Sequence, residues 1–246
     1  MVVAAKTVKA QEKLEGTIYS AASAIEEAGG KAMPVQVDIR SEDQVEDAMA
    51  HAAGVFGGID VVVNNASALG LTGTSETEMK RFDLMHGINA RGTFVTSKAG
   101  LKYLLKSDKN PHVLNISPPL NMDPKWFAPH TAYTMAKYGM SMCTLGMAQE
   151  FKGKVAFNAL WPRTTIATAA IKNLLGGEQV MARSRKPDIM ADAAALIVQQ
   201  DAAEFTGNFL IDDDVLKDLG GLAESDLDKY LVDPANKDNL EPDFFL

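Results

Sequence analysis

Short apolar runs alternate with longer segments of helical spacing along most of this sequence, and no other feature limits the fold as strongly. The runs are nearly continuous in apolar residues, which is typical of strands in a sheet that is covered on both faces. They are Val2–Ala5, Ala32–Val37, Ile59–Val63, His112–Ile116, Val155–Leu160 and Asn208–Ile211. Strands that are joined through helices form right-handed βαβ units. The sequence therefore predicts an α/β fold with a parallel, doubly wound, Rossmann-like sheet.

The segments between these runs have the spacing of amphipathic helices. They are Thr17–Ala28, Glu42–Val55, Glu76–Leu105, Ala132–Phe151 and Asp188–Gln199. Ser41 and Gln44 have the spacing of a capping box at the start of the second helix. No internal repeat or low-complexity linker divides the chain, so one domain is expected over residues 1–212.

The segment 213–246, which is rich in acidic residues, breaks this alternation. We expect it to form a tail that packs on the same domain. Phe244 and Phe245 are the apolar residues that would hold this tail to the surface. The alternative is a tail that docks a partner or bridges two subunits.

Composition excludes several classes of function. The net charge of −8 at pH 7 opposes binding to the phosphates of nucleic acids. No apolar run approaches the roughly 20 residues that span a bilayer, so no membrane span is expected. Cys143 is the single cysteine, which excludes an internal disulfide and suits a reducing compartment. We expect a cytoplasmic protein that acts on a small molecule and has no metal site; the peroxisome or mitochondrion is the alternative in a eukaryote.

Tyr133 and Lys137 are the strongest candidates for chemistry. Residues four apart lie on one face of a helix, so the phenol and the ammonium can point into the same cleft. A nearby cation favours the phenolate and lowers a tyrosine pKa from about 10 toward the range useful for proton transfer. The alternative is a surface tyrosine beside a solvated lysine.

Further motifs surround this pair in the sequence. They are Asp60–Ala66 (DVVVNNA), Asn89–Gly92 (NARG), Asn115–Ser117 (NIS), Asn158–Pro162 (NALWP) and Thr206-Gly207. Together with Tyr133-x-x-x-Lys137, their order and spacing resemble the short-chain dehydrogenase/reductase family over residues 1 to about 212. Three stretches resemble one subgroup of that family most closely: residues 115–120, residues 131–141 and residues 241–245.

The resemblance implies roles for the residues of the motifs. Tyr133 would exchange a proton with the substrate while hydride passes to or from a nicotinamide. Lys137 would hold the nicotinamide ribose and lower the tyrosine pKa, and Asn89 would hold a water of the proton relay. Ser117 is the candidate for orienting the substrate, although the family serine can also be the residue replaced here by Pro118.

Cofactor residues are implied in the same way. Asp38 corresponds to an aspartate that contacts adenine. Asn65 and Ala66 belong to the turn after the third run, where Ser67 replaces the usual glycine. Pro162 and Thr165 lie at the nicotinamide end, and Arg163 replaces a glycine between them.

Lys6 bears on the choice of cofactor. A carboxylate at the end of this strand pairs with a ribose 2′-hydroxyl, whereas a cation accommodates a 2′-phosphate. Lys6 therefore favours NADP over NAD, and a merely solvated lysine is the alternative.

One family feature is missing from the sequence. A dinucleotide fold opens with a strand and a glycine-rich turn that binds the pyrophosphate, and no run here is followed by such a turn. We therefore expect that the sequence begins at the second strand of an N-terminally truncated fold, with Met1 an artefactual start. Two inner sheet edges would then be unpaired.

The predicted function is an NADP-dependent oxidoreductase that interconverts an alcohol and a ketone or aldehyde on a lipophilic substrate. The lipophilic preference rests on methionines at Met135, Met140, Met142 and Met147 with Trp126 and Phe127, for which core or dimer packing is the alternative explanation. The resemblance also implies a homo-oligomer built through residues 76–105 and 132–151. The alternative function is a dehydrogenase-like scaffold that binds a lipid or a protein and performs little or no redox chemistry.

Overall fold

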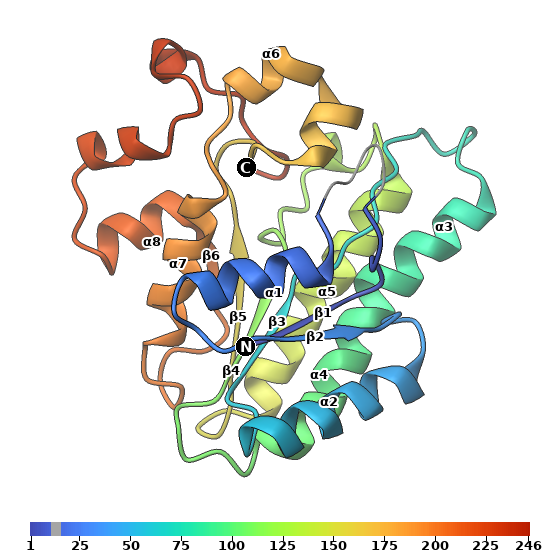
Figure 1. The fold of residues 1–246 in the computed structure, drawn as a ribbon. Coiled ribbons are helices and arrows are strands. Elements are labelled where there is room, and N and C mark those ends of the chain that lie inside the picture. The colour runs from blue at the N-terminus through green and yellow to red at the C-terminus, as the bar shows by residue number, and fades with distance from the viewer. Residues whose placement is uncertain (11–15) are drawn as a thin grey trace.

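The computed structural model describes residues 1–10 and 16–246, and parallel strands form its centre (Figure 1). The described strands are β1 Val2–Ala5, β2 Met33–Gln36, β3 Val61–Asn64, β4 His112–Ile116, β5 Ala156–Trp161 and β6 Phe209–Ile211. Each of their pairings is parallel, and each strand lies within about two residues of a run predicted from the sequence. The predicted Rossmann-like α/β fold is confirmed.

Eight α-helices are described between and after the strands. They are α1 Ile18–Glu27, α2 Glu42–Phe56, α3 Met79–His86, α4 Gly92–Leu104, α5 Thr131–Glu150, α6 Gly177–Ala182, α7 Asp188–Val198 and α8 Asp212–Asp218. Short 3₁₀-helices lie at Pro124–Trp126, Glu224–Tyr230 and Pro234–Asn239, and π-helices at Gly87–Arg91 and Ile171–Leu175. No helix in the described part of the chain is long and apolar enough to cross a membrane.

The start of α2 shows how local sequence sets a boundary. The Ser41 hydroxyl accepts a hydrogen bond from the backbone N–H of Gln44 at 3.4 Å, as the predicted cap requires. The Gln44 side chain, however, accepts from the backbone N–H of Asp38 at 2.9 Å. It therefore holds the end of β2 in place rather than completing the capping box.

The helix predicted over Glu76–Leu105 is present from Met79 to Leu104, with one feature that was not predicted. A π-helical turn at Gly87–Arg91 joins α3 to α4 within this continuous helical segment. A π-turn inserts one extra residue into the helical hydrogen-bond ladder, which side-chain periodicity does not reveal. Such turns occur often at functional sites, and this one carries Asn89.

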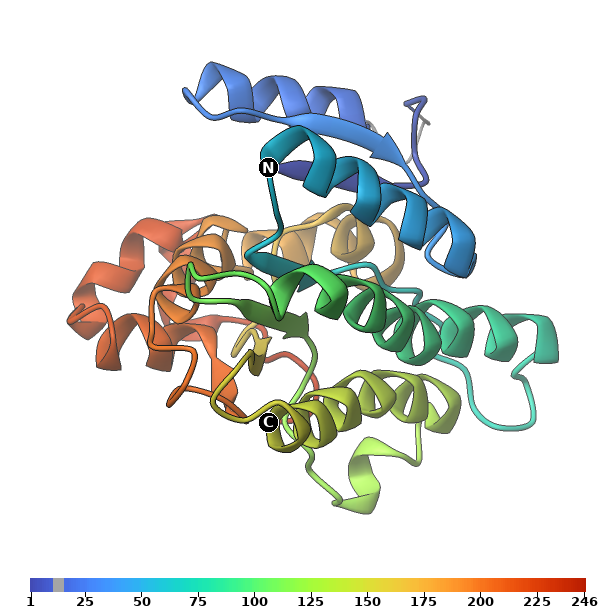
Figure 2. The same ribbon diagram turned by 90° about the horizontal axis from the view of Figure 1, so that it is seen from below.

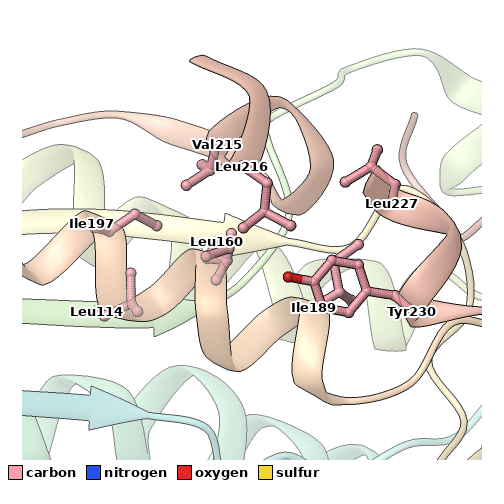
Figure 3. Packing of buried hydrophobic residues seen from close by; sticks show 9 residues of the cluster. Leu114, Leu160, Ile189, Ile197, Val215, Leu216, Leu227 and Tyr230 are labelled. Atoms are coloured by element: carbon pink, nitrogen blue, oxygen red, sulfur yellow. The ribbon is translucent and has the colours of Figure 1, made fainter. Parts of the chain in front are cut away.

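The strands β3, β4, β5 and β6 form a sheet in that order, with helices on both faces. Alternate residues of a strand point to opposite faces. Leu114 and Leu160 pack against α7 and α8, where Ile189, Ile197 and Leu216 are almost fully buried (Figure 3). Val113 and Phe157 pack on the other side against residues of α4 and α5. This double covering explains why the central strands are continuous apolar runs.

The strands β1 and β2 form a separate two-stranded sheet on the β3 side of the molecule (Figure 2). Among the described residues, no strand pairs with the free edge of β1 or with the free edge of β3. A cavity of about 540 Å³ lies between them, lined mainly by apolar residues of β1, α2 and β3. Val61 and Val63 of β3 remain 39% and 50% exposed there. We call this cavity the strand slot.

The tail after β6 is structured. It continues through α8 and two 3₁₀-helices and returns across the molecule to the carboxyl end of β5. Phe245, which is 1% exposed, is buried against residues of α5 and β5. Phe245 is thus the residue that holds this segment against the rest of the fold.

Candidate functional site

The predicted cofactor residues follow the carboxyl ends of parallel strands. Lys6 follows β1, Asp38 follows β2, and Asn65 with Ala66 follows β3; Pro162 and Thr165 come directly after β5. In open α/β folds, ligands bind in the crevice outside these strand ends. Ser117 follows β4 at the same end, and α5 brings Tyr133 and Lys137 there through its first two turns.

The residues Tyr133 and Lys137 are buried on the inner side of α5, at 6% and 2% exposure. The Lys137 ammonium donates a hydrogen bond to the Ile116 carbonyl at 2.8 Å and lies 4.8 Å from the centre of the Trp161 ring. The Tyr133 hydroxyl makes no hydrogen bond with the described part of the chain. The phenol is thus available to a ligand, while the ammonium is tied to the end of β4.

The electrostatics of this pair differ from the sequence expectation. Burial raises the pKa of the Tyr133 phenol, and the Asp243 carboxylate raises it further. Burial lowers the pKa of Lys137 to about 7, which Asp243 partly opposes. The pKa of Tyr133 thus shifts in the direction opposite to the one the sequence predicts, because burial and Asp243 both act on the phenol, while the Lys137 ammonium is bonded to the Ile116 carbonyl.

Ser117 lies one residue beyond β4 and is 1% exposed. Its backbone N–H bonds to the Asn115 carbonyl at 3.0 Å, a three-residue turn that bends the chain just before Pro118. The Ser141 hydroxyl of α5 donates to the Pro118 carbonyl at 2.6 Å and fixes this bend. The Ser117 hydroxyl is buried without a partner among the described residues. A buried hydroxyl without a partner is uncommon in folded proteins, which makes Ser117 a candidate for a functional role.

Asn89 holds the loop after β3. Its side-chain oxygen accepts from the Ala68 N–H at 2.7 Å, and its side-chain nitrogen donates to the Ala68 carbonyl at 3.0 Å. Through these two bonds to Ala68, Asn89 positions the loop that contains Asn65 and Ala66. Asn65 and Ala66 themselves are exposed.

The residues Lys6 and Asp38 form a charged cluster with Arg40. The Lys6 ammonium lies 3.7 Å from Asp38 Oδ2 and its side chain is 71% exposed. Arg40 donates through Nε to Asp38 Oδ1 at 2.9 Å and through Nη2 to Oδ2 at 2.5 Å. These contacts hold the pKa of Asp38 well below its usual range, with the Arg40 hydrogen bonds as the main cause. Sequence reasoning missed Arg40, although it stands only two residues after Asp38.

The segment after β5 is held by its surroundings. Buried Thr165 pairs its hydroxyl with that of Ser184 at 2.7 Å. Arg163, expected beside a nicotinamide, instead donates to Asp213 at 2.6 Å and to Asp214 at 2.6 Å. The aspartates at the start of α8 therefore neutralise that cation. Buried Thr164 has a hydroxyl without a partner among the described residues, a group that sequence reasoning did not single out.

Comparison with known proteins agrees with this architecture. The family described as short chain dehydrogenase matches residues 3–179. Hydroxysteroid dehydrogenase-like protein 2 of Danio rerio is 58% identical over 246 residues, which are 100% of this chain and 57% of that protein. The chain thus spans little more than half the length of this curated relative.

Two solved bacterial structures are also similar. One, from Xanthomonas campestris, has 52% identity and a TM-score of 0.93, covering 100% of this chain and 88% of that one. A short chain dehydrogenase from Mycobacterium thermoresistibile has 48% identity and a TM-score of 0.91, covering 100% and 85%. The subgroup indicated by residues 115–120, 131–141 and 241–245 is that of hydroxysteroid dehydrogenase-like protein 2 and its bacterial relatives, and this resemblance is confirmed. The chain belongs to the short-chain dehydrogenase/reductase family.

Proposed function

We propose that this oxidoreductase uses NADP(H) to interconvert an alcohol and a ketone or aldehyde on an apolar substrate. One observation carries the proposal: Tyr133 and Ser117 are both buried at the end of the molecule where the strands have their carboxyl ends, and neither hydroxyl makes a hydrogen bond within the described chain. A carbonyl oxygen that accepts hydrogen bonds from both hydroxyls would satisfy them together.

The residues present fit a dinucleotide at two of its parts. Lys6, Asp38, Asn65 and Ala66 would hold the adenosine half, and Pro162 and Thr165 would border the nicotinamide half near Tyr133 and Lys137. No glycine-rich turn follows a strand within residues 1–10 and 16–246, so the described residues offer no comparable cradle for the pyrophosphate. The bound cofactor would supply or accept the hydride.

The residues of the chain would handle the proton. In reduction, Tyr133 would donate its phenolic proton to the carbonyl oxygen as negative charge develops there. Lys137 has a pKa of about 7, and its protonated form would stabilise the resulting phenolate. Asn89 positions the loop after β3 and would hold a water of the proton relay through the N–H that its two bonds to Ala68 leave unused.

Aromatic and aliphatic side chains around Tyr133 support an apolar substrate. The cluster that contains Tyr133 includes Trp161, Phe245, Trp126 and Leu120. The methionines of α5 do not add to this argument: Met140 and Met147 are buried in the core, whereas Met135 and Met142 are 46% and 57% exposed on the outer face.

Lys6 gives a test of cofactor choice. Replacing Lys6 with Asp removes a cation beside the proposed 2′-phosphate, and a charge-assisted hydrogen bond contributes about 1.5–3 kcal/mol. We expect Lys6→Asp to weaken NADPH binding at least tenfold and to narrow or reverse the preference over NADH, measured by fluorescence titration of both cofactors. Lys31→Asp serves as the control, because it makes the same change of charge at a position before β2, away from the carboxyl ends of the strands. A parent protein that already prefers NADH would refute the assignment of Lys6.

We also propose a homo-oligomer formed through α4 and α5. Phe94 on α4 and Met142 and Leu145 on α5 are each more than half exposed. Large exposed apolar groups on neighbouring helices are typical of an interface. The double variant Met142→Asp, Leu145→Asp is expected to run as a monomer in light-scattering chromatography. Tyr19→Asp on α1, 57% exposed, should keep the oligomer; an unchanged mass for the double variant would exclude this face.

A scaffold without redox activity is the second candidate, and the raised pKa of Tyr133 favours it because a neutral, desolvated phenol resists ionisation. Fluorescence of NADPH separates the two functions. Enhanced emission on mixing, followed by NADPH consumption with a ketone, supports the enzyme; neither signal from a folded protein supports the scaffold. We propose a cytoplasmic location for either, consistent with the single free thiol of Cys143.

A further inference from the structure

The C-terminal segment Glu241–Phe245 is bound to the chain just after β5. The Thr165 N–H donates to the Glu241 carbonyl at 2.9 Å, and the Asp243 N–H donates to the Arg163 carbonyl at 3.0 Å. Thr164 and Pro242 form an antiparallel bridge between these two bonds. The segment is thus a short strand-like element whose side chains have fixed positions at the candidate active site.

The segment places the Phe245 ring beside the catalytic candidate Tyr133. The two ring centres are 6.4 Å apart, and the Phe245 ring lies 5.8 Å from Trp126 and 5.9 Å from Trp161. Trp161 links this segment to Lys137. Its Nε1 donates to the Phe244 carbonyl at 2.9 Å, and the Lys137 ammonium lies over its ring. The Phe245 ring therefore lies beside Tyr133 and beside the Trp161 ring over which the Lys137 ammonium lies.

The backbone of Phe245 is held in an unusual conformation. Its φ angle is +76°, in the left-handed region that non-glycine residues with large side chains rarely adopt. Phe245 nevertheless remains only 1% exposed. Strained backbone of this kind persists where the surroundings over-determine it and is concentrated at functional sites. The conformation points the ring into the site, whereas the following Leu246 stays 38% exposed.

We propose that Phe245 is a specificity-determining residue of the active site. Its buried ring fills the space beside the Tyr133 ring, as a wall that limits the size of the group that a carbonyl substrate can place on that side. This inference rests on the proposed function, because it assigns a wall to the same site. A packing role alone would affect all substrates equally, whereas a wall changes the preference between small and bulky ones.

The test compares Phe245→Ala and Phe245→Leu with the unmodified chain and with Leu246→Ala as the matched control. Turnover with NADPH is measured on 2-butanone and on propiophenone, a small and a bulky ketone. We expect the ratio of kcat/KM for propiophenone over 2-butanone to rise at least tenfold in Phe245→Ala and less in Phe245→Leu, with no change in Leu246→Ala. A ratio within twofold of the parent in folded Phe245→Ala overturns the wall and leaves the proposed function standing. If Phe245→Ala does not fold, Phe245→Leu decides.

A binding measurement separates failure of the wall from failure of the enzyme. Trp126 and Trp161 are the two tryptophans of the chain, and both lie beside Phe245, so their fluorescence reports occupancy of the site. Titration with propiophenone is expected to give quenching at least fivefold tighter in Phe245→Ala than in the parent. If propiophenone binds more tightly to Phe245→Ala but no ketone is turned over, the proposed function is rejected and the proposed role of Phe245 as a wall stands. Equal binding in the two proteins rejects the wall.

Discussion

Replacing Tyr133 with Phe is expected to abolish turnover while leaving the affinity for NADPH nearly unchanged. The substitution removes the proposed proton donor and keeps the ring that packs against Phe245 and His130. A positioned general acid contributes about 10²- to 10⁴-fold to a rate, so kcat should fall by at least about a hundredfold. Steady-state kinetics and NADPH titration on the same preparation measure both effects.

Tyr138→Phe is the matched control for this experiment. Tyr138 is also buried on α5, but its hydroxyl donates to the Asn121 carbonyl at 2.5 Å and is therefore committed to the fold. We expect this variant to retain turnover. Activity of Tyr133→Phe within threefold of the parent would show that the phenol is not the acid.

Lys137→Met extends the argument to the second member of the pair. The ammonium is proposed to contact the cofactor ribose and to stabilise the phenolate, so its loss should lower both kcat and NADPH affinity. The bond from Lys137 to the Ile116 carbonyl is lost as well. A fall in kcat with unchanged NADPH affinity would support the proposed electrostatic role of Lys137 and refute its proposed contact with the cofactor ribose.

The strands and most helices could be predicted because their signals are local. Continuous runs such as His112–Ile116 reflect burial on both faces, and Ser41 marks the start of α2 through its own side chain. The π-turn at Gly87–Arg91 could not be predicted, since it changes hydrogen-bond register without changing side-chain type. Local pattern also gave no boundary for α8, because three aspartates in succession have no apolar period.

The part of the candidate site that local motifs define could be predicted, whereas the part that depends on distant segments could not. The predicted residues belong to local motifs: those such as Lys6, Ser117 and Thr165 follow strand ends, and Asn89, Tyr133 and Lys137 lie in helical motifs. The contribution of Asp243 and Phe245 depends instead on a tail that returns over a long sequence separation to Arg163 and Tyr133. The raised pKa of Tyr133 has the same origin, because burial and the nearness of Asp243 are tertiary properties.

The strand slot leads to the largest expected effect on stability. The edges of β1 and β3 leave backbone N–H and C=O groups without a strand partner in the described chain, and Val61 and Val63 stay exposed beside them. Unpaired backbone groups and exposed apolar side chains both lower the stability of the folded state. The slot has the right chemistry for one extended segment that pairs with both edges and buries alternate apolar side chains.

We expect that a β-branched strand delivered into this slot strongly stabilises the protein. A strand parallel to β1 needs a crossover, so it is fused ahead of Met1 through about 35 residues that include a helix. Each buried aliphatic side chain contributes roughly 1.5–3 kcal/mol, and several together approach the 5–15 kcal/mol stability of a typical domain. The fusion should sharpen thermal unfolding, raise the melting temperature and abolish binding of an apolar dye. If the fused segment also supplies glycines for an anion-binding turn, NADPH affinity should rise.

A fusion of equal length with alternate strand valines changed to serine is the control, because it keeps the crossover but loses the apolar burial. The control should melt like the parent chain and bind dye as the parent does. A parent chain that already melts cooperatively, binds no dye and gains no stability from the valine strand would contradict the slot. In that case the edges of β1 and β3 must find their partners elsewhere, and a second subunit is the source to examine, since dimers can pair strands across an interface.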